Sequence, residues 1–361
     1  MMKKICMVDY DMSVRGGVEQ VTTSLANALA DYYDVYVVSI CLKGNLAYTL
    51  DRRVHFVALG AKEQRLRHLQ HAVKPMLKDF FKDNDIAVAI AQGTYTGFIV
   101  APLRMCCNTK LIFCDHGALM NQWNDKSTVI VRLISSILCN RIVTLTKRSL
   151  DDYRKKFCIP SSKIRCIYNW SDLEGLLPPI YNQDSKKIIS AGRFGKEKGF
   201  DQLIKAFALV APKHPDWSLT IYGDGEMMPT VKELVTEYHL EKQVRLPGMC
   251  TDLDKRYQEY AMYVLPSYRE GLPLVLLEAK ANRLPIVSFD ILTGPREIVR
   301  DQIDGMLVPP KDISALTNAM NYLIEHPEVR KEMSDHSQEN LDLFSKEKIL
   351  AEWKSLIDSL L

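Results

Sequence analysis

Four charged side chains in the second half of the chain have the types and the spacing needed to bind a phosphorylated sugar. Glu270 and Glu278 stand eight residues apart, and Gly-Leu-Pro directly follows Glu270. Arg193 and Lys198 lie in a glycine-rich segment, Gly-Arg-Phe-Gly-Lys-Glu-Lys-Gly. Cations and free backbone amides stabilise the charge of a diphosphate, and carboxylates accept hydrogen bonds from sugar hydroxyls. This combination favours a site for a nucleotide sugar.

The elements expected around Glu270 would hold these groups at one edge of a sheet. An apolar run at 262–265 predicts a buried strand, and a polar loop follows it as far as Gly271. Pro273 suits the first turn of a helix, where its missing N–H costs little. Glu278 then lies about two turns into the helix. Free N–H groups at the start of this helix favour an anion; they belong to Gly271, Leu272 and Leu274.

The same residues resemble those of a known family. Glu270 and Glu278 resemble the E-x7-E signature of retaining glycosyltransferases of family 4, and the segment from Gly192 resembles that family's G-R-x-x-x-x-K-G motif. The resemblance extends over nearly the whole chain. It implies an α/β protein of the GT-B fold, in which two Rossmann-like, doubly wound domains face each other across a cleft and a C-terminal helix crosses back to the first domain.

The resemblance also implies an activity. The protein would be a hexosyltransferase that moves a hexose or N-acetylhexosamine from a nucleotide sugar, most simply a UDP-sugar, to a glycan or lipid-linked acceptor in polysaccharide biosynthesis. The transfer would retain the anomeric configuration and would need no metal and no other cofactor. Arg193 and Lys198 would stabilise the leaving diphosphate, Glu278 would hold the ribose hydroxyls, and Glu270 would hold a donor-sugar hydroxyl. The remaining donor-binding positions implied in this half are Gly192, Gly223, Gly248, Met249, Gly271, Leu272, Pro273 and Leu274.

Two segments of the first half are further candidates for the site. A strand at 3–8 is followed by Gly16-Gly17 and then a helix, which is an anion-binding arrangement, although two glycines also form a plain tight turn. His116 follows an apolar strand, at the end where doubly wound folds bind ligands. In the resembled family, a Gly-Gly loop lies beside the donor phosphate and a histidine lies near the donor sugar. A structural role for His116 is the alternative.

The chain length and one polar stretch predict the domain organisation. A chain of 361 residues is too long for one ordinary core and suits two domains. Strand-like runs separated by helical patterns predict parallel sheets with helices on both faces. The proline-containing stretch 177–185 predicts the boundary. We therefore expect an acceptor-binding domain at 1–177, a nucleotide-sugar-binding domain at 178–345, and a helix at 346–361 that packs back on the first domain.

The two halves of the chain differ in charge. Residues 1–180 carry 24 Lys and Arg against 16 Asp and Glu, a net +8, whereas residues 181–361 carry 23 against 28, a net −5. A basic half suits an acidic partner or a plain solvated surface. The most basic segment, 62–82, has one apolar stripe and contains Pro75, which predicts a kink or a break. It is either a surface helix packed on the sheet or a basic face toward the acceptor or an anionic membrane.

Composition sets the expected compartment. The chain has no uninterrupted apolar segment long enough to span a membrane. Nine cysteines without a C-x-x-C pair fit reduced thiols in the cytosol. We therefore expect a cytoplasmic protein with no nucleic-acid partner, and a peripheral association with the inner face of the membrane remains open.

Four alternatives to this prediction are possible. Asp9 and Asp11 form an Asp-x-Asp pair, which binds a metal-nucleotide complex in the other large glycosyltransferase fold, but there the pair follows several strands and here it ends the first. A nucleotide-sugar epimerase of the same architecture would use much of the same site. An inert, glycosyltransferase-like subunit would not need every one of Arg193, Lys198, Glu270 and Glu278. The absence of G-x-G-x-x-G disfavours a NAD-dependent enzyme.

Overall fold

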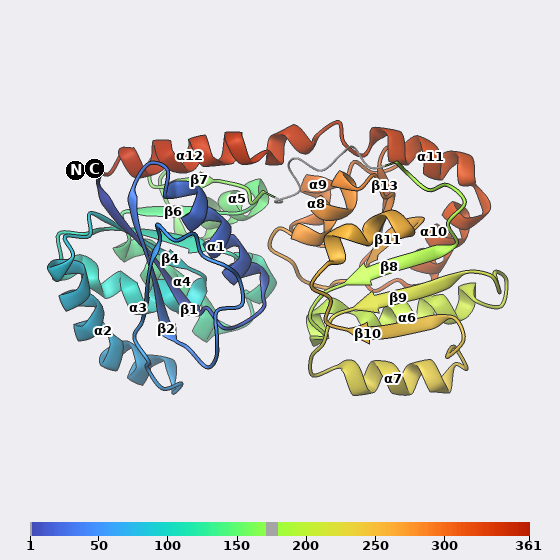
Figure 1. Ribbon diagram of the computed structural model, residues 1–361, viewed down its shortest axis with the longest axis horizontal. Coiled ribbons are helices and arrows are strands. Elements are labelled where there is room, and N and C mark those ends of the chain that lie inside the picture. Colours follow the sequence, from blue (N-terminus) through green and yellow to red (C-terminus); the bar gives the residue numbers. More distant parts are fainter. Residues whose placement is uncertain (1, 171–179) are drawn as a thin grey trace. The chain divides into compact units, whose positions relative to one another are not determined.

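The computed structural model describes residues 2–170 and 180–361, and its contacts divide the chain into two units (Figure 1). Unit 1 comprises Met1–Asn169 and Lys346–Leu361, and unit 2 comprises Trp170–Ser345. The boundary predicted between residues 177 and 178 lies outside the described residues. The last residues of the chain therefore belong to the same unit as the first.

Unit 1 is built on a seven-stranded parallel sheet with the order β3-β2-β1-β4-β5-β6-β7. The chain adds strands on one side of β1 and then on the other, so the direction of winding changes between β1 and β4. Ligands bind at such a switch point in doubly wound folds. The strands are β1 (Lys4–Asp11), β2 (Asp34–Cys41), β3 (His55–Ala58), β4 (Val88–Gln92), β5 (Lys110–Asp115), β6 (Arg141–Thr144) and β7 (Ile164–Cys166).

The helices of unit 1 show one clear difference from the sequence-based expectation. The helix α2 runs through Pro75 without interruption, so the predicted break is wrong. Its buried residues Leu69, Val73, Leu77 and Phe81 lie on one stripe, and packing of this stripe holds the helix together around the proline. The helices are α1 (Gly17–Leu29), α2 (Leu66–Asp83), α3 (Thr94–Val100), α4 (Lys126–Leu138), α5 (Lys147–Phe157) and α12 (Lys346–Asp358), with the 3-10 helices η1 (Ala101–Met105) and η2 (Leu119–Gln122).

Unit 2 contains a six-stranded parallel sheet with the order β10-β9-β8-β11-β12-β13. Here the switch point lies between β8 and β11. The first two strands of this sheet along the chain are β8 (Lys187–Ala191) and β9 (Ser218–Tyr222). The others are β10 (Val244–Gly248), β11 (Met262–Leu265), β12 (Ile286–Phe289) and β13 (Gly305–Val308).

Helices pack on both faces of this second sheet, which explains why its four central strands are buried almost throughout, whereas the edge strand at 244–248 is largely accessible. Pro273 is the N-cap of α8 with an extended backbone, so α8 begins one residue later than predicted. The helices are α6 (Phe200–Val210), α7 (Met228–Glu237), α8 (Leu274–Ala281), α9 (Pro295–Ile298), α10 (Ile313–Glu325) and α11 (Pro327–His336), with η3 (Lys196–Lys198), η4 (Leu253–Lys255), η5 (Tyr257–Glu259) and η6 (Leu341–Phe344).

The C-terminal helix α12 is an integral part of unit 1. It contacts α1, and the Tyr33 hydroxyl donates a hydrogen bond of 2.6 Å to Asp358 Oδ1. Its buried side chains are Ile349, Trp353, Leu356 and Ile357. Within residues 2–170 and 180–361, no helix is both long enough and apolar enough to cross a membrane.

We predict that Trp353→Ala lowers the free energy of unfolding of unit 1 by about 3–5 kcal/mol, because it leaves a cavity where a buried indole packed. Chemical denaturation monitored by circular dichroism measures the change. Glu347→Gln, an exposed substitution in the first turn of the same helix, is the control and should change stability by less than about 0.5 kcal/mol. Equal stability of the two variants would show that α12 does not contribute to the core of unit 1.

Candidate active site

The loops that follow β8 and β11 meet at the switch point of unit 2. The backbone N–H of Tyr268 donates a 2.7 Å hydrogen bond to the carbonyl oxygen of Glu197. Gly199 has φ +65°, and a Cβ atom there would lie 2.1 Å from the carbonyl oxygen of Pro266. Only glycine permits this approach. The two loops are therefore fixed to each other through their backbones.

An ion pair between Lys198 and Glu270 joins the same two loops through their side chains. Lys198 Nζ lies 2.7 Å from Glu270 Oε1, and the two side chains are 21% and 10% exposed. A partly buried pair of this kind is screened by water less than a surface pair. The lysine expected to hold phosphate and the glutamate expected to hold sugar thus lie in direct contact.

Arg193 has a different environment from Lys198. Its side chain is 74% exposed, and its Nη2 donates a 2.7 Å hydrogen bond to Glu197 Oε1. Burial raises the pKa of Glu197, but the hydrogen bond and charge of Arg193 outweigh burial and hold the pKa below its usual value. The sequence analysis did not single out Glu197. The opposite charges four residues apart were the available signal.

Glu278, the second carboxylate of the motif, is held by a buried tyrosine. The Tyr257 hydroxyl donates a 2.7 Å hydrogen bond to Glu278 Oε2. Burial, together with the nearby charge of Glu278, raises the pKa of Tyr257 well above its usual value, so this hydroxyl remains a donor. The sequence analysis missed Tyr257, because no local pattern links η5 to α8.

The turns after β8, β9 and β10 also interlock. Gly223 has φ +129°, and a Cβ atom there would lie 1.9 Å from the carbonyl oxygen of Gly192. Its N–H donates a 2.9 Å hydrogen bond to the carbonyl oxygen of Gly248. Met249 follows directly and is 53% exposed. The structure therefore gathers the glycines predicted from the sequence at one edge of the sheet.

Backbone amides at the start of α8 are available for an anion. Among the described residues, no protein atom accepts a hydrogen bond from the N–H groups of Gly271 and Leu272. Such orphan donors, with the helix dipole behind them, attract negative charge. The Thr293 hydroxyl donates a 2.7 Å hydrogen bond to the carbonyl oxygen of Glu270 and so helps to fix the loop that precedes these amides.

The glycine pair of unit 1 begins a helix, in the predicted order of strand, loop and helix. Gly16 is the N-cap of α1, Gly17 is its first residue, and the Tyr48 hydroxyl donates a 3.2 Å hydrogen bond to the carbonyl oxygen of Gly16. A Cβ atom on Gly16 would lie 2.5 Å from Glu19 Oε2. A side chain at this position would therefore displace the first acidic residue of α1.

His116 lies at the end of β5, beside the last residue of β4. Its Nε2 lies 2.6 Å from Oε1 of the buried Gln92, a contact in which the Nε2–H tautomer donates. Burial lowers the pKa of His116 to about 4, and the charge of Asp115 opposes this only in part. The imidazole is therefore neutral near pH 7 and can act as a hydrogen-bonding group.

Asp115 precedes His116 and is neutralised within a buried cluster. Asp115 Oδ2 lies 2.9 Å from Arg132 Nε and accepts a 2.6 Å hydrogen bond from the Tyr153 hydroxyl. Burial raises the pKa of Asp115, but the charge of Arg132 and these hydrogen bonds outweigh burial and hold the pKa below its usual value. The cluster fixes the backbone that carries His116.

Comparison with known proteins agrees with this arrangement. The family model described as "Glycosyl transferases group 1" matches residues 179–340, and "Glycosyltransferase Family 4" matches residues 15–174. An uncharacterized glycosyltransferase of Haemophilus influenzae is 30% identical over 360 residues, which are 99% of this chain and 100% of the relative. The chain belongs to the group 1 and family 4 glycosyltransferases.

Further similarities bear on the fold of this glycosyltransferase. The amylovoran biosynthesis glycosyltransferase AmsD of Erwinia amylovora is 25% identical over 99% of this chain and 100% of its own length. Sucrose-phosphate synthase from Thermosynechococcus elongatus superposes with a TM-score of 0.88 at 19% identity, covering 99% of each chain. Anabaena HepE, in complex with UDP and glucose, superposes with a TM-score of 0.82 at 18% identity, covering 99% of this chain and 100% of its own. The predicted GT-B fold is confirmed.

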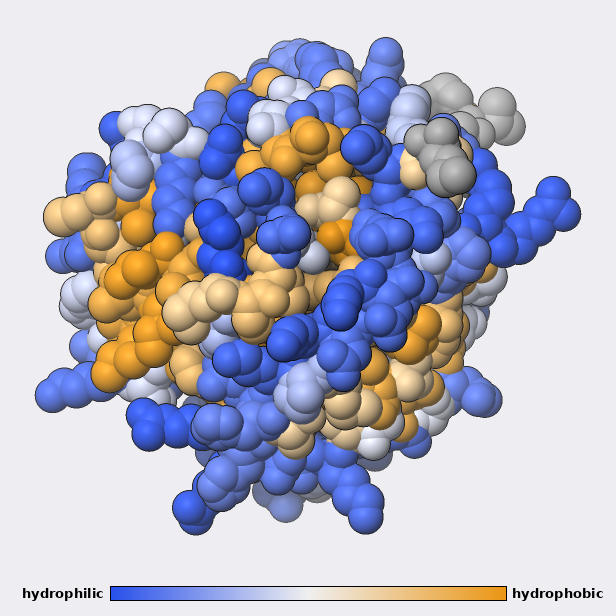
Figure 2. Space-filling view, turned by 90° about the vertical axis from the view of Figure 1, so that its left-hand side faces the viewer, coloured by the Kyte–Doolittle hydropathy of each residue, from blue (hydrophilic) through white to orange (hydrophobic). Residues whose placement is uncertain are grey.

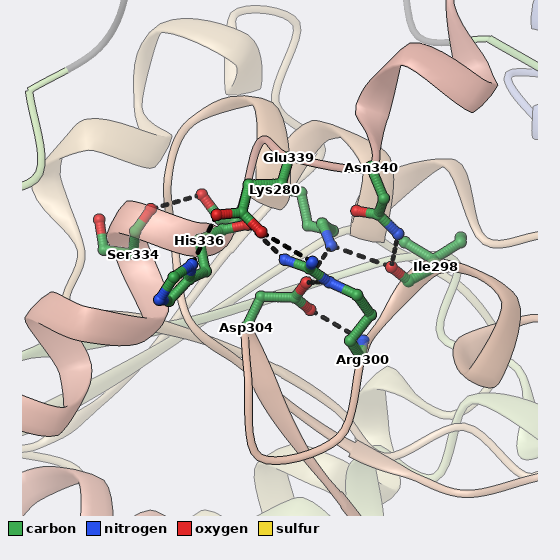
Figure 3. Close-up of polar contacts among 9 residues, drawn as sticks. Lys280, Ile298, Arg300, Asp304, Ser334, His336, Glu339 and Asn340 are labelled. Carbon is green, nitrogen blue, oxygen red and sulfur yellow. Dashed lines mark hydrogen bonds and ion pairs between the residues drawn. The ribbon is translucent and has the colours of Figure 1, made fainter.

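A buried polar network supports α8 of the glycosyltransferase (Figure 3). Lys280 Nζ lies 2.7 Å from Asp304 Oδ2, with both side chains fully buried, and also donates a 3.0 Å hydrogen bond to the carbonyl oxygen of Ile298. Arg300 Nε approaches the same Asp304 oxygen to 2.6 Å, and Arg300 Nη1 lies 2.8 Å from Glu339 Oε2. Burial lowers the pKa of Lys280 to about 8, although Asp304 opposes this. The network ties the helix that carries Glu278 to the segment after α11.

The carboxylates of the Asp-x-Asp pair have partners within the protein. The Thr22 hydroxyl donates a 2.7 Å hydrogen bond to Asp9 Oδ2, and burial raises the pKa of Asp9 to about 6. Asp11 Oδ1 accepts hydrogen bonds from the Ser13 N–H and hydroxyl at 3.0 and 2.6 Å. In the part of the chain that the structure describes, no three His, Cys, Asp or Glu side chains form a group that could hold a metal ion.

We predict that His116 makes unit 1 sensitive to acid. The unfolded chain takes up the imidazole proton near pH 6.5, whereas the folded protein does so near pH 4, so stability present above pH 6.5 is lost as the pH falls. Between about pH 7 and pH 5 this group alone should cost about 2 kcal/mol. Denaturant unfolding of the wild type and of His116→Gln measures the difference. Parallel pH profiles of the two proteins would contradict an imidazole that stays neutral in the folded protein.

We predict that removing Asp304 from the buried Lys280–Asp304 pair destabilises unit 2 more than removing Lys280 does. Asp304→Ala leaves the Lys280 charge buried without a carboxylate and should destabilise unit 2 by about 3–5 kcal/mol. Lys280→Met should cost less, because Arg300 still neutralises Asp304. Thermal and denaturant unfolding measure both variants. A larger loss for Lys280→Met than for Asp304→Ala would contradict this assignment of the charges.

Proposed function

We propose that this glycosyltransferase is a retaining, metal-independent enzyme that moves a hexose or N-acetylhexosamine from a UDP-sugar to a lipid-linked or other glycan acceptor. The contact between Lys198 and Glu270 at the switch point of unit 2 carries this proposal. It joins the cation suited to a diphosphate and the carboxylate suited to a sugar hydroxyl.

In the absence of donor, Lys198 and Glu270 satisfy each other. When the donor binds, its diphosphate takes the place of Glu270 as the partner of Lys198, and Glu270 turns to a hydroxyl of the sugar. Breaking the bond between the anomeric carbon and the diphosphate oxygen increases the negative charge on the leaving group. Lys198 and the amides of Gly271 and Leu272 stabilise that charge more strongly in the transition state than in the ground state.

The other residues of the site position the donor. Glu278, oriented by the Tyr257 hydroxyl, accepts hydrogen bonds from the ribose. Arg193 lies in the loop after β8 that also carries Lys198, and its exposed side chain adds positive charge near the diphosphate. The glycine turns at Gly192 and Gly223 keep side chains away from the nucleotide. Unit 1, with Gly16, Gly17 and His116, contributes groups for the acceptor and the donor sugar.

Retention follows from transfer on one face of the sugar. The acceptor oxygen forms its bond to the anomeric carbon on the face that the diphosphate leaves, and the acceptor proton passes to the leaving diphosphate oxygen. No protein nucleophile and no second carboxylic acid are needed, so Glu270 stabilises positive charge at the anomeric carbon rather than attacking it.

The names and descriptions of similar proteins support the choice of donor and acceptor. Solved structures of Staphylococcus aureus TarM and Anabaena HepE are described as complexes with UDP. A Campylobacter jejuni relative, 25% identical over 366 residues, is named for transfer of N-acetylgalactosamine to a sugar on diphospho-undecaprenol. For this chain we accordingly propose work in glycan assembly on the cytoplasmic side of a membrane, with peripheral attachment to it.

We predict that Lys198→Ala lowers turnover about 100-fold, because one charge-stabilising group at the leaving diphosphate is lost. Lys196→Ala in the same 3-10 helix removes an exposed lysine and is the matched control, with turnover near that of the wild type. UDP release from a panel of UDP-sugars, with and without lipid-linked acceptors, measures both variants. Near-normal transfer by Lys198→Ala would remove this residue from its proposed role. Conversion of the donor without acceptor would instead indicate an epimerase.

We predict that a chelator leaves transfer largely intact, because the charge on the leaving group is met by Lys198 and backbone amides. The measurement compares initial rates with excess EDTA and with added Mg²⁺ or Mn²⁺. Complete loss of activity that a divalent ion restores would overturn metal independence and would favour Asp9 and Asp11 as a metal-binding pair.

A further inference from the structure

The helix α4 of unit 1 has its polar and apolar faces reversed. Its buried positions are Thr128, Val131, Arg132, Ser135 and Ser136, of which four are polar or charged. Arg132 neutralises Asp115 in the interior, and the two serine hydroxyls donate hydrogen bonds to carbonyl groups of the helix itself. A surface helix of a water-soluble domain has the opposite arrangement. The polar face of α4 is therefore the face that is buried in unit 1.

After Lys126 and Ser127, which are exposed polar residues at its start, the outward side of α4 is apolar. Ile130 and Ile137 are 53% and 59% exposed, and Leu133 and Ile134 between them are partly exposed. These four positions follow the i, i+3, i+4, i+7 spacing of one helix face. The neighbouring 3-10 helix η1 contacts α4 and ends at Met105, which is 71% exposed. We name the exposed side chains of Ile130, Ile137 and Met105 the α4 ridge.

Basic side chains border the α4 ridge. Lys163 Nζ donates a 2.7 Å hydrogen bond to the carbonyl oxygen of Ile137, and Arg104 is the residue before Met105. Arg141 lies beside Lys163 in the sheet, because Ile142 pairs with Ile164 and the Ile142 N–H donates a 2.9 Å hydrogen bond to the carbonyl oxygen of Lys163. Burial lowers the pKa of Lys163, Cys139 opposes this, and the charges of Arg104 and Arg141 lower the pKa further. Within residues 2–170 and 180–361, no carboxylate forms an ion pair with any of these three basic residues.

The helix α2 extends the basic surroundings. It contacts η1 and α3, and α3 contacts α4. The exposed basic side chains of α2 include Arg67, Lys78 and Lys82. Figure 2 views unit 1 from the side of α2 and shows several groups of hydrophobic residues on this face, with hydrophilic residues between them. An apolar ridge with a cationic border is complementary to a partner that has an apolar layer beneath an anionic outer layer.

We infer that the α4 ridge docks this glycosyltransferase on an anionic phospholipid membrane, with Ile130, Ile137 and Met105 inserted among the lipids and Arg104, Arg141 and Lys163 at the phosphate level. Apolar side chains of an interfacial helix enter the boundary between headgroups and acyl chains, and basic residues add attraction to anionic lipids. This inference deepens the proposed function, since it rests on the lipid-linked acceptor being reached at a membrane.

Charge favours a membrane over a second copy of the chain as the occupant of the ridge. In a two-fold contact the same patch faces itself. The cations of Arg104, Arg141 and Lys163 would then approach their own copies, and like charges in contact disfavour association. Anionic headgroups instead supply the opposite charge at the border and an apolar layer at the centre.

Vesicle flotation of the purified chain of residues 1–361 tests the inference. The wild type should float with phosphatidylcholine vesicles that contain phosphatidylglycerol, and binding should weaken without phosphatidylglycerol and in high salt. Ile130→Ser/Ile137→Ser should reduce binding about tenfold or more, because apolar area no longer enters the lipid. Arg104→Gln/Arg141→Gln should reduce it about 25-fold, at about fivefold for each basic residue near the surface.

Leu209→Ser is the matched control for the isoleucine variant, because Leu209 is a 53% exposed apolar residue on α6 of unit 2. It should bind vesicles like the wild type. Unchanged thermal unfolding of the isoleucine and arginine variants shows that unit 1 still folds. Failure of the wild type to bind, or equal binding by the isoleucine variant, would overturn the inference. A concentration-dependent dimer that Ile130→Ser/Ile137→Ser dissolves would overturn it in favour of a second copy.

Transfer to a water-soluble acceptor without vesicles separates this inference from the proposed function. The isoleucine and arginine variants should retain wild-type rates with that acceptor and should lose rate only with an acceptor presented in anionic vesicles. Absence of UDP release by the wild type from any UDP-sugar would sink the proposed function, whereas vesicle binding by the wild type and its loss in the variants would still support the α4 ridge.

Discussion

The contact between Lys198 and Glu270 is the constraint around which unit 2 is arranged. Their loops leave β8 and β11, which are neighbours in the sheet but are separated in the chain by the 70 residues 192–261. Parallel strands bring the two loops to one edge, Gly199 allows their backbones to touch, and the ion pair joins their side chains. In the proposed donor complex a diphosphate replaces Glu270 as the ionic partner of Lys198, and Glu270 accepts a hydrogen bond from a sugar hydroxyl instead.

The interactions around that pair fall into two groups with different physical roles. In the network of Lys280, Asp304 and Arg300, the first two side chains are fully buried, and the network holds α8 in place. The hydrogen bond from Tyr257 to Glu278 and the ion pair of Arg193 with Glu197 orient groups that a ligand can reach. A network that fixes α8, combined with polar groups that can change partners when a ligand binds, suits a site that stabilises charge on a leaving group.

In unit 1, one buried cation has two consequences. Arg132 neutralises Asp115, and this holds the segment that carries the neutral imidazole of His116. Because Arg132 and the serines of α4 occupy the inner face of that helix, the apolar residues of α4 are left on the outside. The chemistry of the His116 loop and the apolar ridge on the surface thus arise from the same arrangement of one helix.

The amino-acid sequence by itself determined the alternation of strands and helices, and it located charged loops at the carboxyl ends of strands. It also determined the motifs with Lys198, Glu270 and Glu278. All of these features depend on local periodicity and short spacing. The partners of those residues depended on the tertiary structure. Tyr257 reaches Glu278 from a separate segment, and helix α2 continues through Pro75 because packing against the rest of unit 1 outweighs the lost hydrogen bond. The sequence pattern of α4 shows that the helix is amphipathic but does not show which face is buried. That depends on Asp115 at the end of β5, because its buried carboxylate is neutralised by Arg132 on the inner face of α4.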